Sequence, residues 1–194
     1  MPICIWVDCD DVLSETKNEL LKRPELVSKW ITRDDMIVCY MKDIKKLWIN
    51  SDEALQIFNS YLESPEYWET EPISGAYEKL YELKEAGHTL FVVTARNEVY
   101  EKQTKERVET HFPWIFSDFL FMNQYSDNEI PKFQLCKEKW VQLLIDDNVD
   151  NIQGMNLIWM PWFLLDKPWN QWVEDSDLLK RVYSRDEIDV SRFF

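Results

Sequence analysis

The amino terminus of the chain carries an apolar run that ends abruptly in acidic residues. Residues 3–7 read Ile-Cys-Ile-Trp-Val, and Asp8, Asp10 and Asp11 follow within four positions. Such a run predicts a strand, and a strand that delivers aspartates to its carboxyl end places them where open α/β sheets bind ligands. Because side chains alternate along a strand, Asp8 and Asp10 can converge only if the backbone bends directly after Asp8.

Convergent carboxylates repel one another unless a cation lies between them or one of them keeps a proton. A divalent metal together with a phosphate ester would meet this requirement at Asp8 and Asp10. The alternative is an acidic loop between strand and helix, in which Asp10 or Asp11 caps the helix that follows. Residues 8–11 alone do not decide between the two interpretations.

Further apolar runs bounded by polar turns predict parallel strands that are buried on both faces. The predicted strands cover residues 3–7, 89–93, 118–122, 141–145 and 156–160, with a possible edge strand at 178–183. Helical patterns lie between them, at residues 76–86, 99–112 and 131–140. This alternation predicts an α/β fold, a Rossmann-like open parallel sheet with helices on both faces.

The segment between Asp11 and Glu71 breaks this rhythm because it contains no convincing strand pattern. Its apolar residues mark at least one amphipathic helix, at Ile44, Leu47, Trp48, Leu55, Phe58 and Leu62. We expect a small helical cap of residues 16–67, inserted after the first strand into a core domain of residues 1–15 and 68–194. The alternative is a long two-helix crossover packed on the sheet.

Composition excludes several classes of function. The chain has 194 residues and a net charge of −14, which argues against a nucleic-acid polymer as partner, since such surfaces need clustered basic residues. Only three glycines are present, so a glycine-rich phosphate or dinucleotide loop is excluded. Ten tryptophans are many for this length, and we expect most of them to pack in the core or at its rim.

The sequence favours a cytoplasmic protein. The four cysteines lack metal-type spacing and are expected to be reduced thiols. No basic segment precedes the first apolar run, so a signal peptide is not expected, and no apolar run approaches the length that spans a membrane.

Two later segments also place polar side chains at strand ends. Thr94 closes an apolar run and precedes Ala95, so a hydroxyl lies beside backbone N–H groups that can hold phosphate oxygens. Asp146 and Asp147 close the run 141–145 as a second carboxylate pair. Taken singly, Thr94 could be an ordinary strand-end residue, and the acidic pair could cap a helix. Together, on consecutive strand ends of one sheet, they predict one site.

A lysine near these strand ends could neutralise a phosphoryl oxygen and the surrounding aspartates. Lys132, Lys137 and Lys139 all precede the strand that ends in Asp146. We favour Lys132 because it starts a helix whose amino end would face the carboxyl edge of the sheet. The alternative is that Lys132 is an ordinary solvated lysine.

This ordered set resembles the signature of the haloacid dehalogenase superfamily of phosphohydrolases. The matching segments are Asp8-Cys9-Asp10-Asp11-Val12, Val92-Val93-Thr94, Lys132 and Leu144-Ile145-Asp146-Asp147. More closely, the segments Pro72-Ile73-Ser74-Gly75-Ala76 and Val93-Thr94-Ala95-Arg96, together with Pro168-Trp169-Asn170 near the carboxyl end, are similar to the 5′(3′)-deoxyribonucleotidase family. The chain departs from that family at Asp11, where the family often has glycine.

The resemblance implies a mechanism in which Asp8 attacks phosphorus and forms an aspartyl-phosphate, while Asp10 protonates the leaving oxygen and then activates water. It implies Mg²⁺ bound by Asp8, the carbonyl of Asp10 and Asp147, with Asp146 orienting the lysine, although either member of the acidic pair could bind the metal. Thr94, Ala95 and Lys132 would bind phosphate.

The expected activity is that of a phosphoric monoester hydrolase acting on a nucleoside monophosphate, either deoxy or ribo. Two alternatives remain at this point: the same chemistry on a sugar phosphate or another small phosphomonoester, and a non-catalytic protein that uses the fold to hold a ligand.

Overall fold

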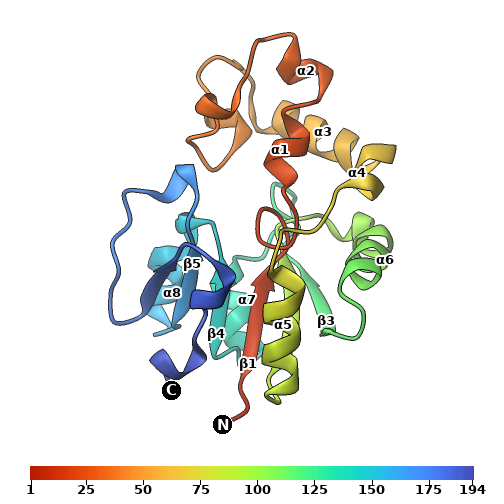
Figure 1. The fold of residues 1–194 in the computed structure, drawn as a ribbon. Helices are drawn as coiled ribbons and strands as arrows, with labels where there is room; N and C mark the ends of the chain where they lie inside the picture. The colour runs from red at the N-terminus through yellow and green to blue at the C-terminus, as the bar shows by residue number, and fades with distance from the viewer.

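Six parallel strands form one open sheet in the computed structural model, which describes residues 1–194 (Figure 1). The strands are β1 Cys4–Asp8, β2 Thr89–Thr94, β3 Phe116–Phe121, β4 Leu143–Asp146, β5 Trp162–Leu165 and β6 Leu179–Val182. Their order in the sheet is β3-β2-β1-β4-β5-β6. The direction of winding reverses between β1 and β4, and ligands bind at such a reversal in open α/β sheets.

Eight α-helices connect or cover the strands. They are α1 Thr16–Leu20, α2 Pro24–Val27, α3 Ser51–Leu62, α4 Pro65–Glu69, α5 Ala76–Glu85, α6 Glu101–His111, α7 Lys132–Glu138 and α8 Ile152–Leu157. Seven single 3-10 turns complete the chain, at Arg33–Asp35, Met41–Asp43, Glu98–Tyr100, Val149–Asn151, Pro168–Asn170, Arg185–Glu187 and Val190–Arg192. The sequence prediction of an α/β fold with a parallel sheet is confirmed.

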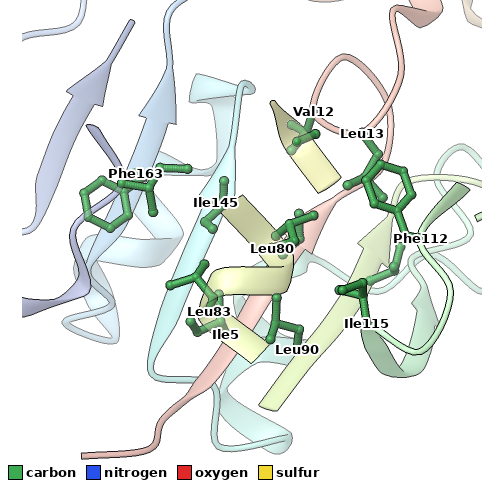
Figure 2. Close-up of a cluster of buried hydrophobic side chains, with 14 of the residues drawn as sticks. Ile5, Val12, Leu13, Leu80, Leu83, Leu90, Phe112, Ile115, Ile145 and Phe163 are labelled. Atoms are coloured by element: carbon green, nitrogen blue, oxygen red, sulfur yellow. The ribbon is translucent and has the colours of Figure 1, made fainter. Parts of the chain in front are cut away.

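Helices cover both faces of the sheet. Leu80 and Leu83 of α5 pack against Ile5 and Leu90 of the sheet in one core, to which α6 also contributes (Figure 2). A second core on the opposite face joins sheet residues such as Trp6 to apolar residues of α7 and α8. Because residues 5–8 of β1 are buried between these two cores, the strand fixes the position of Asp8 at its carboxyl end.

The helices α1–α4 and the segments between them form an insert, residues 16–69, which lies above the carboxyl ends of the strands (Figure 1). The insert has its own apolar core, in which Leu26, Leu47 and Tyr61 are fully buried. Its longest helix, α3, begins with a capping box, because Asn50 and Glu53 each accept a hydrogen bond from the other's backbone N–H. The division at residues 16–67 stays a prediction, but a helical insert after β1 is present.

The predicted strand at 156–160 is wrong. These residues form the end of α8 and the turn after it, and the strand begins at Trp162. A short apolar run does not distinguish a strand from a helix by pattern alone. Leu157 and Trp159 are 76% and 79% exposed, so this run is not a buried strand. The possible edge strand at 178–183 is confirmed as β6.

Most tryptophans were expected to pack in the core or at its rim, but seven of the ten are exposed. Five of the seven have left-handed backbone conformations with φ between 52° and 65°, namely Trp30, Trp48, Trp114, Trp140 and Trp159. Trp30, Trp140 and Trp159 each follow the end of a helix, and the hydrogen bonds around them are those of a Schellman motif, which favours glycine at that position.

No helix of the structure is long and apolar enough to cross a membrane.

Candidate active site

The carboxyl edge of the sheet and the insert enclose a cavity of about 350 Å³. The sheet side contributes the acidic strand ends, Lys132 and the residues after β2. The insert contributes a wall of mainly apolar residues, which includes Leu20, Tyr40, Met41, Leu55 and Phe58. The cavity therefore has one charged side and one apolar side.

Lys132 connects the first and the last of the predicted acidic strand ends. Its Nζ donates to Asp8 Oδ1 at 2.8 Å and to Asp146 Oδ2 at 2.7 Å, and all three residues are buried. Burial alone would lower the pKa of Lys132, but Asp146 and Asp8 more than offset this and raise it. Lys132 is therefore a fixed cation at the amino end of α7, whereas Lys137 and Lys139 are exposed.

Three carboxylates gather at this point. Oxygen atoms of Asp8, Asp146 and Asp147 lie within 4.8 Å of one another. Burial raises the pKa of Asp8 well above its ordinary value, and the neighbouring carboxylates act in the same direction against Lys132. Burial likewise raises the pKa of Asp147, to about 7. The cluster carries more negative charge than one lysine compensates.

This donor set suits a hard divalent cation, which prefers oxygen ligands. Both oxygens of Asp146 already accept hydrogen bonds, from Lys132 and from the backbone N–H of Asn148 at 2.9 Å. One oxygen of Asp147 accepts from Trp169 Nε1 at 2.8 Å. The second oxygens of Asp8 and Asp147 make no hydrogen bond within the chain. These two residues fit a metal best, while Asp146 holds the lysine.

Asp10 lies apart from this cluster and is paired with an arginine. Arg96 donates to both of its carboxylate oxygens, at 2.7 and 3.1 Å, and Thr16 Oγ1 donates to Oδ1 at 2.7 Å. Burial would raise the pKa of Asp10, but Arg96 outweighs burial and lowers it. The chain turns sharply after Asp10, because Asp11 has a φ of 60°.

Thr94 and Ala95 lie at the end of β2, as predicted. Thr94 is buried and its hydroxyl accepts from the backbone N–H of Arg96 at 3.3 Å, while Ala95 lines the cavity. The structure thus brings Asp8, Lys132, Asp146 and Asp147 into direct contact or close proximity. Asp10 and Ala95 border the same cavity.

Sequence reasoning assigned no role to Arg96, Trp169 or Lys17, all of which border or support the site, and it did not predict the contact that Tyr40 makes. Arg96 directly follows the Thr94–Ala95 pair, so its place in the loop after β2 was a usable signal. Tyr40 belongs to the insert, and its hydroxyl accepts from Asn148 Nδ2 at 3.0 Å. No pattern in the sequence indicates that contact, because it joins residues 108 positions apart.

Comparisons with known proteins agree with this geometry. A family model described as "5' nucleotidase, deoxy (Pyrimidine), cytosolic type C protein" matches residues 1–190. A protein of Bacillus cereus described as "Putative nucleotidase" is 31% identical over 90 residues, which are 46% of this chain and 47% of that protein. The alignment thus spans about half the length of that relative.

Solved structures share the fold at low sequence identity. A haloacid dehalogenase-like hydrolase from Streptococcus pneumoniae superposes with a TM-score of 0.68 at 14% identity, over 96% of each chain. A hydrolase of the same superfamily from Geobacter sulfurreducens gives a TM-score of 0.61 at 14% identity, over 97% of this chain and 98% of that one. Solved haloacid dehalogenase-like hydrolases thus share the fold, and because the family model covers nearly the whole sequence, the protein belongs to this 5′-nucleotidase family.

Proposed function

We propose that the protein is a Mg²⁺-dependent phosphatase that hydrolyses the phosphomonoester of a nucleoside monophosphate through an aspartyl-phosphate. The observation that carries this proposal is the placement of Asp8, with one free carboxylate oxygen, between Lys132 and Asp147 at the charged side of the cavity. This arrangement offers a nucleophile, a fixed cation and an oxygen-rich metal site within a few ångströms.

The phosphate would be held by Lys132, the Thr94 hydroxyl and backbone N–H groups near Ala95. One oxygen of Asp8 attacks phosphorus and is oriented by its hydrogen bond from Lys132, while the free oxygen stays available to the metal. A bound Mg²⁺, held by Asp8, the Asp10 carbonyl and Asp147, would neutralise charge on the phosphoryl oxygens. Asp146 keeps Lys132 in place through the bond of 2.7 Å.

Asp10 would transfer the protons. It gives a proton to the leaving oxygen in the first step and takes one from water in the second. The ion pair with Arg96 favours the carboxylate and therefore favours the second step. Arg96 also donates to Tyr67 Oη at 2.8 Å and to Thr104 Oγ1 at 3.1 Å, so its guanidinium is held on both sides and keeps Asp10 oriented.

The apolar side of the cavity is the part that suits a nucleobase. Its residues come from the insert and include Tyr40 and Phe58, and Tyr125 of the core also lines it. Stacking of a base on an aromatic ring contributes about 1–3 kcal/mol in nucleic-acid binders. A sugar phosphate has no flat apolar group for these rings, so we favour a nucleotide over a sugar phosphate.

The direct test is phosphate release from deoxynucleoside monophosphates, ribonucleoside monophosphates and ribose 5-phosphate at equal concentrations, with Mg²⁺ and with EDTA. We expect nucleoside monophosphates to be cleaved best and EDTA to stop the reaction. Equal cleavage of ribose 5-phosphate would replace this proposal with a general phosphatase. Release from none of the substrates would favour a ligand-binding protein.

A further inference from the structure

A buried charge pair joins the insert to the metal-binding carboxylates. Asp11 is 4% exposed and lies three residues after the proposed nucleophile. Its Oδ1 accepts the backbone N–H of Lys17 at 3.0 Å, and its Oδ2 lies 3.3 Å from Lys17 Nζ. Lys17 belongs to α1, the first helix of the insert. The mechanism proposed above uses neither residue.

The same lysine reaches the opposite side of the site. Lys17 Nζ lies 4.0 Å from Asp147 Oδ2 and 3.3 Å from the ring centroid of Trp169. Trp169 in turn donates its indole N–H to that same oxygen of Asp147. The Lys17 ammonium therefore lies among two carboxylates and an aromatic face, with its side chain only 13% exposed.

We propose that Asp11 and Lys17 form a compensated pair that positions Asp147 and sets the affinity of the site for its divalent cation. A lysine so close to a metal ligand would by itself repel the cation. Asp11 supplies the balancing negative charge, and its backbone bond to Lys17 anchors α1 to the loop after β1. This inference rests on the proposed function, because it assumes that Asp147 binds the metal.

Because Asp11 and Lys17 carry opposite charges, substitution of one is expected to change the Mg²⁺ affinity in the opposite direction from substitution of the other. Asp11→Asn leaves the Lys17 charge uncompensated and is expected to weaken Mg²⁺ binding about tenfold. Asn tolerates the left-handed backbone at this position, so the turn is kept. Lys17→Met keeps an unbranched side chain of similar length beside Trp169, leaves Asp11 uncompensated and is expected to tighten Mg²⁺ binding by a similar factor. The double variant is expected to return to within about threefold of the unchanged protein.

The measurement is calorimetric titration of Mg²⁺ into the EDTA-treated, dialysed full-length protein, with no substrate present. Lys22→Met is the matched control, because Lys22 follows α1 closely but its side chain is 66% exposed and pairs only with Glu19. It is expected to leave the Mg²⁺ affinity unchanged. If both single substitutions weaken binding and the double variant is weaker still, or if neither changes it, the proposal is overturned.

Thermal melting of the metal-free variants separates failure of this inference from failure of the proposed function. Lys17→Met removes the cation shared by Asp11 and Asp147, so its Tm is expected to fall, and adding Asp11→Asn is expected to restore part of the loss. If the unchanged protein binds no Mg²⁺, the proposed metal site is refuted. The recovery of Tm in the double variant still tests whether Asp11 and Lys17 form a compensated pair. Absence of that recovery refutes the pair itself.

Discussion

The carboxyl edge of the sheet and the insert face each other across one cavity, but they hold their side chains by different means. At the sheet edge, Asp8, Asp146 and Lys132 are 7%, 0% and 3% exposed and are joined by hydrogen bonds of 2.7 and 2.8 Å. The insert instead presents Phe58 and Tyr40 from a helix and an irregular segment that pack on a separate apolar core.

This contrast indicates that the sheet edge carries the catalytic groups, whereas the insert contributes to substrate recognition. The sheet edge is positioned by strands that are buried on both faces, so its geometry follows from the fold. The apolar wall of the insert, which includes Leu20, Leu55 and Phe58, makes no hydrogen bond to the carboxylates and can vary without moving them. Substitutions at the sheet edge should therefore abolish turnover, and substitutions in this apolar wall should change the choice of substrate.

The largest effect is expected at the nucleophile. Asp8→Asn keeps the shape of the side chain but removes the attacking oxygen charge, so kcat should fall by about three to four orders of magnitude. The fold should survive, because the amide oxygen can still accept from Lys132. Phosphate release and circular dichroism on the same sample are the measurements. A folded Asp8→Asn variant with near-normal turnover would exclude the aspartyl-phosphate.

Removal of the buried cation should affect stability as well as turnover. Lys132→Met leaves Asp8 and Asp146 without their shared partner, and loss of one member of a buried ion pair costs about 3–5 kcal/mol. Urea unfolding gives the free energy of unfolding directly. Lys137→Met and Lys139→Met are matched controls on exposed positions and should change it by less than about 0.5 kcal/mol. If a control variant lost as much free energy of unfolding as Lys132→Met, the buried ion pairs of Lys132 would not be the cause of the loss.

The acidic cluster should make stability depend on pH and on metal. Burial raises the pKa of Asp147 to about 7, above the value of about 4 expected in the unfolded chain. The folded metal-free protein therefore keeps a proton that the unfolded chain releases, and its stability falls as pH rises from about 4 to 7.

Mg²⁺ replaces that proton, so it should raise Tm more at pH 8 than at pH 5. Melting curves with and without EDTA at the two pH values measure this. Asp147→Asn should flatten the metal-free dependence and remove the Mg²⁺ effect. A Mg²⁺ effect that stays the same in that variant would place the ion elsewhere.

The insert should act on substrate binding. Phe58→Ala removes an aromatic ring from the apolar wall of the cavity, so KM for nucleoside monophosphates should rise about tenfold while kcat changes little. Steady-state kinetics with ribose 5-phosphate as a second substrate provide the comparison, since no base is present to lose contact. Val27→Ala is a control on an exposed part of the insert that does not line the cavity. Equal increases in KM for both substrates would count against stacking.

The smallest effects are expected at the left-handed tryptophans. A non-glycine residue in this conformation costs about 1–2 kcal/mol, and the Trp114 side chain is 92% exposed. Trp114→Gly should therefore raise the free energy of unfolding by about 1 kcal/mol. Trp172→Gly is the matched control, because Trp172 is 71% exposed without a positive φ and should gain nothing. Chemical denaturation of the two variants decides the point.

The sequence predicted the sheet edge well because carboxylates after apolar runs converge wherever parallel strands share an edge. Asp8, Asp146 and Asp147 could be placed from strand order, and Lys132 was favoured over Lys137 and Lys139 because it starts a helix that faces this edge. The fifth strand was misplaced because residues 157–160 are apolar in an exposed helix end and turn. The contacts of Asp10 with Thr16 and of Asp11 with Lys17 were not predicted, because they depend on how the insert folds back over the sheet.

The left-handed tryptophans also have a consequence for the gene. A tryptophan codon and a glycine codon can differ by a single base, so Trp30, Trp48, Trp114, Trp140 and Trp159 each stand one nucleotide from the residue that their backbone favours. The chain has ten tryptophans against three glycines. These five positions are therefore the ones at which the identity of the inserted amino acid, tryptophan or glycine, is worth testing directly. Peptide mass spectrometry of the protein from its own cells would show which amino acid the ribosome inserts there.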